Sequence, residues 1–307
     1  MITTLLKRIS AAISDGAILS GHPELVPLEV ARDFPDIERQ LVREEWPFLE
    51  SDLEISHAQP RATAFVARKR GEFAGFFSCH HFGDVGYLDM MIIDPAFRRE
   101  GVARPLYFGT LREMKKKGMR GFVVHTTADS ARLIRLIGFR GGQTFTLLAR
   151  DAAGSPVSAD PLVTRLSPAD AVELIALDAA VFGLSRPTWV GGLLAQSSPA
   201  FFGIKRGGRL TAAITLRARR GGALCLDGAN ARSFKDLEIL ALEVIARHAD
   251  RRLECFVKDG SALDRTLRAE GFAVPEFFTR IGPLVEWRKG ATGRLGISPH
   301  TQCLSWF

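Results

Sequence analysis

The chain has few cysteines, only two tyrosines and no long hydrophobic run. None of its apolar stretches approaches the roughly 20 residues that a membrane-spanning helix needs, so we expect no membrane partner. Residues 1–21 are mildly amphipathic, which predicts a packing helix rather than a signal peptide with its long apolar core. The cysteines show no Cys-x-x-Cys spacing; they are Cys79, Cys225, Cys255 and Cys303. Their scatter argues against zinc and disulfides and favours a reducing, cytoplasmic location.

The charge is +7 over 307 residues, but the basic residues are dispersed and are not interleaved with aromatic side chains. A nucleic-acid partner requires a basic stripe or patch, so we expect none, and an anionic cofactor accounts for the excess. The pair His80-His81 invites a metal interpretation. Adjacent residues of a strand point to opposite faces, so these two cannot ligate one ion and we predict no metal site.

The strongest functional signal lies in residues 88–103. An apolar run ends at Pro95, and Arg98, Gly101 and Ala103 then lead into a predicted helix. A glycine lets a ligand approach the backbone closely, and the first amides of a helix are free donors at the positive end of its dipole. This loop therefore suits a phosphate or pyrophosphate. A second turn signal follows at Gly138-Phe139.

At these residues the chain resembles the GNAT superfamily of N-acetyltransferases, over roughly residues 25–150. Their acyl-CoA loop reads Arg/Gln-x-x-Gly-x-Gly/Ala, and their next helix typically ends in Gly-Phe. The resemblance implies acetyl-CoA as cosubstrate, held by this loop and by the preceding strand, which would splay from its neighbour. The cofactor-binding residues that it implies are Met91, Ile92, Ile93, Arg98, Arg99, Glu100, Gly101, Val102, Ala103 and Thr127.

The chain also contains a pseudo-repeat. Lys69-Arg70-Gly71 recurs as Lys205-Arg206-Gly207, and Gly138-Phe139 recurs as Gly271-Phe272, in each case about 135 residues later. In each copy, a strand and two helices are predicted to lead into a hairpin, a strand, a long helix, a strand, a short helix ending at Gly-Phe and a final strand. The second copy lacks Arg-x-x-Gly-x-Ala at residues 224–234, which predicts that it has no working CoA site.

The predicted fold class is therefore α/β (α+β), with two tandem GNAT folds that each have a mixed central sheet flanked by helices. We assign residues 1–152 to an acetyltransferase domain with an N-terminal extension. Residues 159–288 form a second GNAT-like domain with a degenerate CoA loop, and residues 289–307 form a C-terminal tail.

Acetyl transfer to an amine requires a base, because the free amine is mostly protonated at neutral pH. Asp89 is the acidic candidate on the predicted strand before the loop, with Tyr87 on the same face, and His125 ends the next strand. Each of these residues also has a purely structural interpretation. GNAT enzymes often place a tyrosine four residues before the Gly-Phe glycine to protonate the thiolate, and Ile134 stands there. Either the acid comes from elsewhere, or water protonates the thiolate, or the domain is not catalytic.

The leading hypothesis is an acetyl-CoA-dependent N-acetyltransferase that acts on a primary amine of a small molecule by direct attack. The second domain would cover the acceptor cleft. The alternatives are acetylation of a protein lysine or N-terminus, and a non-catalytic acyl-CoA-binding module. We expect a cytoplasmic monomer or homodimer.

Overall fold

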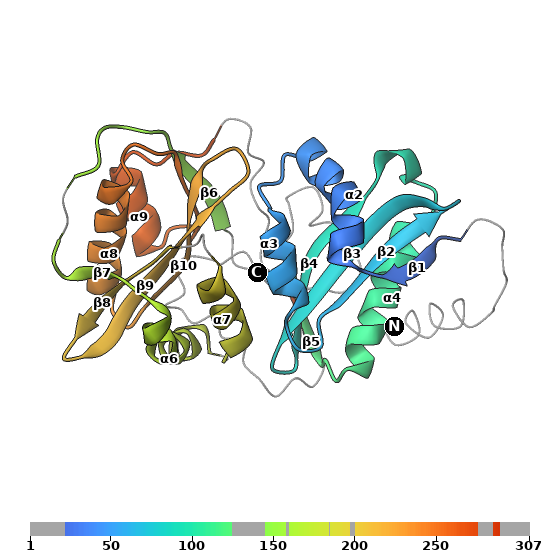
Figure 1. Ribbon diagram of the computed structural model, residues 1–307, viewed down its shortest axis with the longest axis horizontal. Helices are drawn as coiled ribbons and strands as arrows, with labels where there is room; N and C mark the ends of the chain where they lie inside the picture. The colour runs from blue at the N-terminus through green and yellow to red at the C-terminus, as the bar shows by residue number, and fades with distance from the viewer. Residues whose placement is uncertain are drawn as a thin grey trace.

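The computed structural model describes residues 22–124, 145–157, 160–183, 185–196 and 200–275, and the backbone of 285–288. These residues form two six-stranded mixed sheets flanked by helices (Figure 1). The predicted α/β class and the predicted pair of similar folds are confirmed. The helix predicted for residues 1–21 and the tail 289–307 lie outside the described residues, as do His125, Thr127, Ile134 and Gly138-Phe139.

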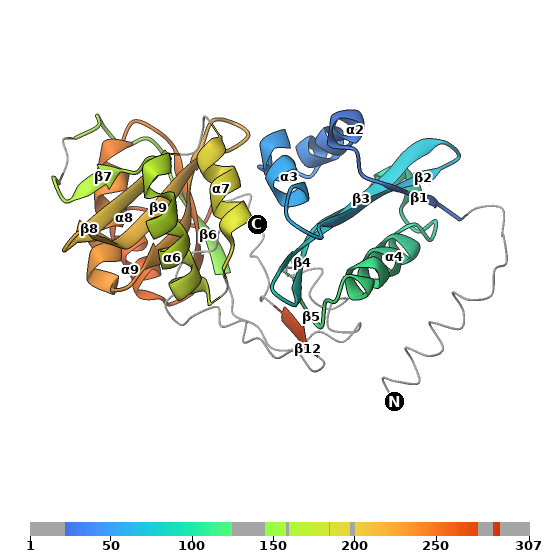
Figure 2. The ribbon, with the colours of Figure 1, turned by 60° about the horizontal axis from the view of Figure 1, so that its bottom comes forward.

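The first half of the chain supplies a strand and two helices, a hairpin, a further strand, a loop, a long helix and a short strand. The elements are β1 (Glu24–Pro27), α2 (Val30–Arg43), α3 (Glu50–His57), β2 (Thr63–Lys69), β3 (Glu72–Phe82), β4 (Val85–Ile93), η1 (Pro95–Phe97), α4 (Ala103–Lys116) and β5 (Gly121–Val124). Helices α2 and α3 cover one face of the sheet and α4 covers the other (Figure 2).

The second half repeats this order, with α6 and α7 on one face of its sheet and α8 and α9 on the other. Its elements are β7 (Val163–Arg165), η2 (Pro168–Asp170), α6 (Ala171–Phe182), α7 (Pro187–Ala195), β8 (Ala200–Arg206), β9 (Arg209–Ala218), β10 (Leu224–Ala231), α8 (Phe234–Arg247), β11 (Leu253–Lys258) and α9 (Ala262–Ala269).

The two halves exchange their last strands. Strand β6 (Phe145–Arg150) pairs antiparallel with β11 of the second sheet, and β12 (Val285–Arg288) pairs antiparallel with β5 of the first sheet. The sequence ranges 1–152 and 159–288 put each strand with the half that precedes it, and the sheets divide the chain differently. Both halves carry the same pattern of elements, so the local sequence of either strand suits either sheet edge.

Turn chemistry accounts for the predicted hairpins and helix ends. Gly71 and Gly207 turn the two hairpins with φ of 81° and 56°, a conformation that favours glycine. The predicted helix after Ala103 is α4, and it ends before Gly118, which has φ of 92°. Ser167 precedes the η2 turn, and its backbone N–H donates to the Asp170 carboxylate at 2.8 Å.

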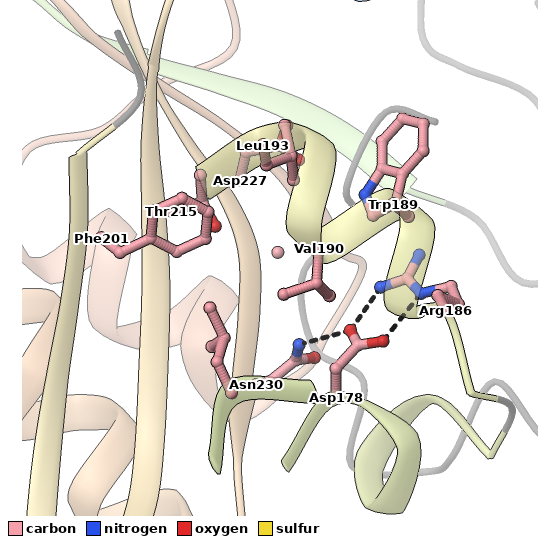
Figure 3. A pocket seen from close by; sticks show the side chains of 11 residues that line it. Asp178, Arg186, Trp189, Val190, Leu193, Phe201, Thr215, Asp227 and Asn230 are labelled. Carbon is pink, nitrogen blue, oxygen red and sulfur yellow. Dashed lines mark hydrogen bonds and ion pairs between the residues drawn. The ribbon is translucent and has the colours of Figure 1, made fainter. Parts of the chain in front are cut away.

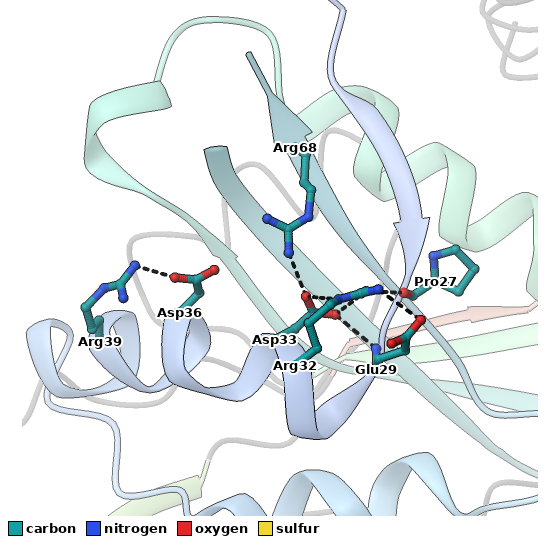
Figure 4. A network of polar contacts seen from close by, with 7 residues as sticks. All are labelled: Pro27, Glu29, Arg32, Asp33, Asp36, Arg39 and Arg68. Carbon is teal, nitrogen blue, oxygen red and sulfur yellow. Dashed lines mark hydrogen bonds and ion pairs between the residues drawn. The ribbon is translucent and has the colours of Figure 1, made fainter. Parts of the chain in front are cut away.

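Helix α2 is fixed at its start by a buried carboxylate (Figure 4). Asp33 accepts hydrogen bonds from the Glu29 N–H at 2.9 Å, from Arg32 at 2.7 and 2.9 Å, and from Arg68 of β2 at 2.7 Å. Burial acts to raise the pKa of Asp33, but these hydrogen bonds outweigh it and hold the pKa below its ordinary value. The network therefore stabilises the fold at neutral pH, and this stabilisation is lost as the pH falls through that lowered value.

One hydrophobic core runs through both halves. It includes Phe76 of β3 beneath α2 and α3, and Trp189 of α7 together with Leu177 of α6. Helices α3 and α7 pack against each other at the centre of the molecule (Figure 2). Separate clusters lie beneath α4 and beneath α8 with α9. Within the described residues, no helix has the length and apolar character needed to span a bilayer.

Four buried charged side chains form a cluster between the two halves. Asp52 of α3 forms ion pairs with Arg217 and Arg219 at the end of β9, and both arginines also pair with Asp227 of β10. The side chains are at most 3% exposed. Removing one member of such a buried set leaves an unpaired charge, which costs about 3–5 kcal/mol. The cluster therefore selects one arrangement of α3 against the second sheet.

Two truncations test the exchanged strand. Ending the chain at residue 284 removes β12 and leaves β5 as an open edge, whereas ending it at residue 288 keeps the strand. We expect faster hydrogen exchange at the β5 amides and a lower melting temperature in the shorter chain only, because it loses hydrogen bonds worth about 1 kcal/mol each. Equal exchange at β5 in both truncated chains would contradict a stabilising role for β12.

Candidate active site

The loop between β4 and α4 presents free backbone donors. The N–H groups of Arg98 and Glu100 donate within the loop, each at 3.3 Å. Among the described residues, no hydrogen bond engages the N–H groups of Gly101, Ala103 and Arg104. The residue before α4, Val102, provides no side-chain cap, and the first turn of the helix carries no acidic residue. The positive end of the α4 dipole is thus open to an anion.

Side chains of the loop hold it in shape. Arg98 donates through Nε to the Ile93 carbonyl at 3.1 Å and pairs through Nη2 with Glu44 at the end of α2. Lys69 pairs with the Glu100 carboxylate at 2.8 Å, and this hydrogen bond lowers the pKa of Glu100. Arg98 and Glu100 are therefore engaged by the protein, and a cofactor role for them stays a prediction.

Strand β4 pairs with β5 over the first four residues of β4. Val85–Leu88 pair in parallel with Gly121–Val124, and Asp89–Ile93 run beyond the described part of β5. The described part of β5 ends at Val124, so the implied splay of β4 stays a prediction. On the other side of β4, Ser78 of β3 faces both Asp89 and Met90, because the register shifts between Leu88 and Met91. Such a bulge bends a strand and re-aims its side chains.

The bulge places Asp89 in a buried polar cluster. One carboxylate oxygen, Oδ2, lies 2.7 Å from Ser56 Oγ of α3, 3.3 Å from Ser78 Oγ and 3.5 Å from His80 Nδ1. The Asp89 side chain is 6% exposed. Its other oxygen, Oδ1, has no hydrogen bond to the described part of the chain and is not among the fully buried unpaired atoms. Within the described part of the chain, one oxygen is therefore anchored and the other is unengaged.

Tyr87, like Asp89, contacts His80 of the neighbouring strand. Its ring stacks on His80 with centroids 5.0 Å apart and an interplanar angle of 18°. Burial, and secondarily the Asp89 carboxylate, raise the pKa of Tyr87 well above its ordinary value. At neutral pH the phenol therefore keeps its proton, which makes Tyr87 a poor base. His125, the third candidate, lies outside the described residues.

The second half contributes to the same cluster. The ring of Trp189 of α7 stacks on that of His80, with centroids 5.7 Å apart and an interplanar angle of 18°. The Arg186 guanidinium lies 5.2 Å from the Phe82 ring centroid. The sequence reasoning did not identify Ser56, Ser78, His80 or Trp189 as part of this site. His80 was considered only with His81 as a metal pair, and no local motif links the other three residues to Asp89.

The second half lacks this constellation at the corresponding positions. Its β9–β10 register shifts in the same way, and Gly228 and Ile214 stand where the first half has Asp89 and Ser78. Ser233 caps α8 by accepting from the Asp236 N–H at 3.2 Å, and Asp236 adds a negative charge to the first turn. This helix start is already occupied by its own side chains and disfavours an anion.

The space beneath α6 and α7 is filled by an ion pair (Figure 3). Asp178 accepts from Arg186 at 2.5 and 2.9 Å and from Asn230 at 3.1 Å. The cavity beside them has a volume of about 20 Å³, which is room for roughly one water molecule. No acceptor substrate fits in this cavity as it stands.

The comparisons identify the fold. Residues 29–139 match the model of the acetyltransferase (GNAT) family. No curated protein shows a significant match to the chain. A proposed acetyltransferase from Pyrococcus horikoshii superposes with a TM-score of 0.72 at 13% identity, covering 95% of this chain and 97% of that one.

Two further solved structures are similar. A tandem GNAT protein from the clavulanic acid biosynthesis pathway gives a TM-score of 0.63 at 16% identity, over 88% of this chain and 100% of that one. A GCN5-related N-acetyltransferase from Sphaerobacter thermophilus gives 0.60 at 15% identity, over 88% and 97%. At these identities the likeness shows the fold: two GNAT acyltransferase folds in one chain.

A matched pair of glycine substitutions tests the loop. Gly101 and Gly118 stand at opposite ends of α4 with φ of 80° and 92°, and a Cβ would meet nothing within 4 Å at either position. Valine should therefore cost each variant a similar backbone strain of about 1–2 kcal/mol. Only Gly101→Val should abolish acetyl-CoA binding, measured by calorimetry, because its side chain enters the space before the free amides. Equal binding by the two folded variants would contradict this use of the loop.

The difference between the two helix starts predicts the stoichiometry. Calorimetric titration with acetyl-CoA should saturate at one ligand per chain, because α4 is open and α8 is capped by Ser233. Gly101→Val should reduce the stoichiometry to zero. A value near two in the unmodified protein, or near one in Gly101→Val, would show that the second half binds the ligand.

Proposed function

We propose that this chain, whose residues 29–139 match the GNAT acetyltransferase family within a tandem GNAT fold, is an acetyl-CoA-dependent N-acetyltransferase that modifies a primary amine of a small molecule. One observation carries the proposal. The carboxylate of Asp89, anchored through Oδ2, and the open N-terminus of α4 lie on one stretch of chain, because β4 carries Asp89 and leads through the loop into α4. An anion site and a base thus follow each other along one strand and the loop after it.

The first half has groups that fit the cosubstrate. The free N–H groups of Gly101, Ala103 and Arg104 would hold its pyrophosphate, and residues Met91–Ile93 of β4 would line its pantetheine arm. When bound, acetyl-CoA supplies the thioester carbon that a neutral amine attacks, and the sulfur leaves with the bonding electron pair.

Asp89 would prepare the amine. An alkyl ammonium must lose a proton before its nitrogen can attack, and a carboxylate within reach accepts that proton directly or through one water. Hydrogen bonds from Ser56 and Ser78 hold Oδ2, so that Oδ1 is the oxygen left for this task. Tyr87 holds its own proton tightly, and we assign protonation of the departing thiolate to solvent. A thiol with an ordinary pKa of about 8.5 makes this step tolerable without an enzymic acid.

The surroundings of Asp89 favour a small acceptor. The side chain lies beneath α3 and is 6% exposed, and α7 of the second half packs against α3 on the same side. We expect this burial to favour a small amine over a lysine on a folded protein surface. Acetylation of a protein would count against this account of the site.

Asp89→Asn tests the base. Acetyl-CoA binding should be nearly unchanged, while turnover of the best amine from a panel should fall by about 10²–10⁴-fold, the usual contribution of a positioned base. The loss should shrink as the pH approaches the pKa of the amine, because the substrate then arrives deprotonated. The measurement is CoA thiol release at saturating acetyl-CoA.

Asp84→Asn, at the β3–β4 turn, is the matched control and should retain full activity. Intact turnover by Asp89→Asn with a lowered melting temperature would make Asp89 structural. Tight acetyl-CoA binding without turnover of any amine by the unmodified protein would favour a binding module instead.

A further inference from the structure

We propose that His80 and Trp189 are positioning residues for Asp89, so that the second half of the chain completes the acceptor site of the first. The inference rests on the proposed function, since it assigns a role to residues that act through the proposed base. The second half has a capped α8 and no counterpart of Asp89. The inference gives this half a part in the reaction.

Only one assignment of donors and acceptors satisfies the hydrogen bonds between His80, Ser56 and Asp89. Ser56 Oγ lies 2.7 Å from Asp89 Oδ2, so its single hydroxyl proton is donated to the carboxylate. The same oxygen lies 3.2 Å from His80 Nδ1 and must therefore accept from it. The network assigns the imidazole proton to Nδ1, and His80 orients the hydroxyl that anchors Asp89. His80 Nε2 is buried and has no partner in the described part of the chain.

Aromatic contacts fix the plane of the His80 ring. Tyr87 and Trp189 both lie nearly parallel to it, at 5.0 and 5.7 Å, and Phe82 meets it edge-on at 4.9 Å. His80 is fully buried and Trp189 is 1% exposed. A change in the ring plane would move Nδ1 away from Ser56, so these contacts maintain the hydrogen bond that reaches Asp89.

Arg186 links the second half to the aromatic rings around His80. This arginine precedes α7, forms the buried ion pair with Asp178 of α6, and lies over the rings of Phe182 and Phe82 at 3.7 and 5.2 Å. It therefore contacts both halves at once, three residues before Trp189. Contacts run without a break from Asp178 in the second half to Asp89 in the first.

Two isosteric substitutions separate positioning from packing at His80. The amide nitrogen of Asn reaches the place of Nδ1, whereas that of Gln reaches the place of Nε2, and both variants lose the ring. We expect His80→Asn to keep kcat for the best amine within a few fold, and His80→Gln to lose about 10²-fold, the effect of a catalytic group displaced by an ångström. The KM for acetyl-CoA should be unchanged in both variants.

A second pair tests the contribution of the second half. Trp189→Phe keeps a flat ring against His80, and Trp189→Leu fills the site without one. The Phe variant should retain kcat and the Leu variant should lose about tenfold or more, again with an unchanged KM for acetyl-CoA. All rates are normalised to the chains that bind acetyl-CoA, so that misfolded protein does not count.

The outcomes are distinguishable. Equal kcat values within both pairs, in an active enzyme, would overturn the positioning role and leave the proposed function intact. A loss in His80→Gln alone would confine the role to the first half and overturn the part assigned to Trp189. Absence of amine turnover by the unmodified protein would overturn the proposed function, and the positioning role with it.

Discussion

The exchange of β6 and β12 is the constraint on which the rest of the structure depends. Each sheet takes its last strand from the other half of the chain, so neither half satisfies all its edge hydrogen bonds alone. Separating the halves would expose two rows of backbone donors and acceptors, each of which costs free energy when it is left unpaired. Because the exchange prevents separation, side chains from the two halves can share one core and one cluster of buried charges.

Helix α3 connects this constraint to the chemistry. Asp52 and Ser56 are four residues apart and so lie on one face of the helix. Asp52 pairs with the arginines of the second half, and Ser56 donates to Asp89. Buried ion pairs add little net stability but penalise every alternative arrangement. The charges that orient α3 against the second half therefore also fix the hydroxyl that anchors the proposed base.

Local patterns in the sequence were enough to predict much of the first half. Glycines at the turns, an apolar run ending at Pro95 and the pattern Arg98-x-x-Gly101-x-Ala103 are all short-range signals, and they predicted the hairpins, the loop and α4. The strand exchange has no such signal, because the two copies share one pattern. The partners of Asp89 were missed for a related reason. Ser56 is 33 residues away and Trp189 lies in the other half, and only the folded sheet brings them to a bulge that periodicity does not reveal.

The two long helices show how the copies diverged. Helix α8 begins with a serine cap and an acidic first turn, features that stabilise a helix start by about 1 kcal/mol. Helix α4 has neither, and its loop holds Arg99 in the left-handed region at φ of 68°, which is unfavourable for a residue with a side chain. Missing caps and local backbone strain are typical of sites where a protein binds its ligand, because function there outweighs local stability. The uncapped start of α4 is therefore the one to expect at the ligand. The capped start of α8 belongs to the half that supports the site.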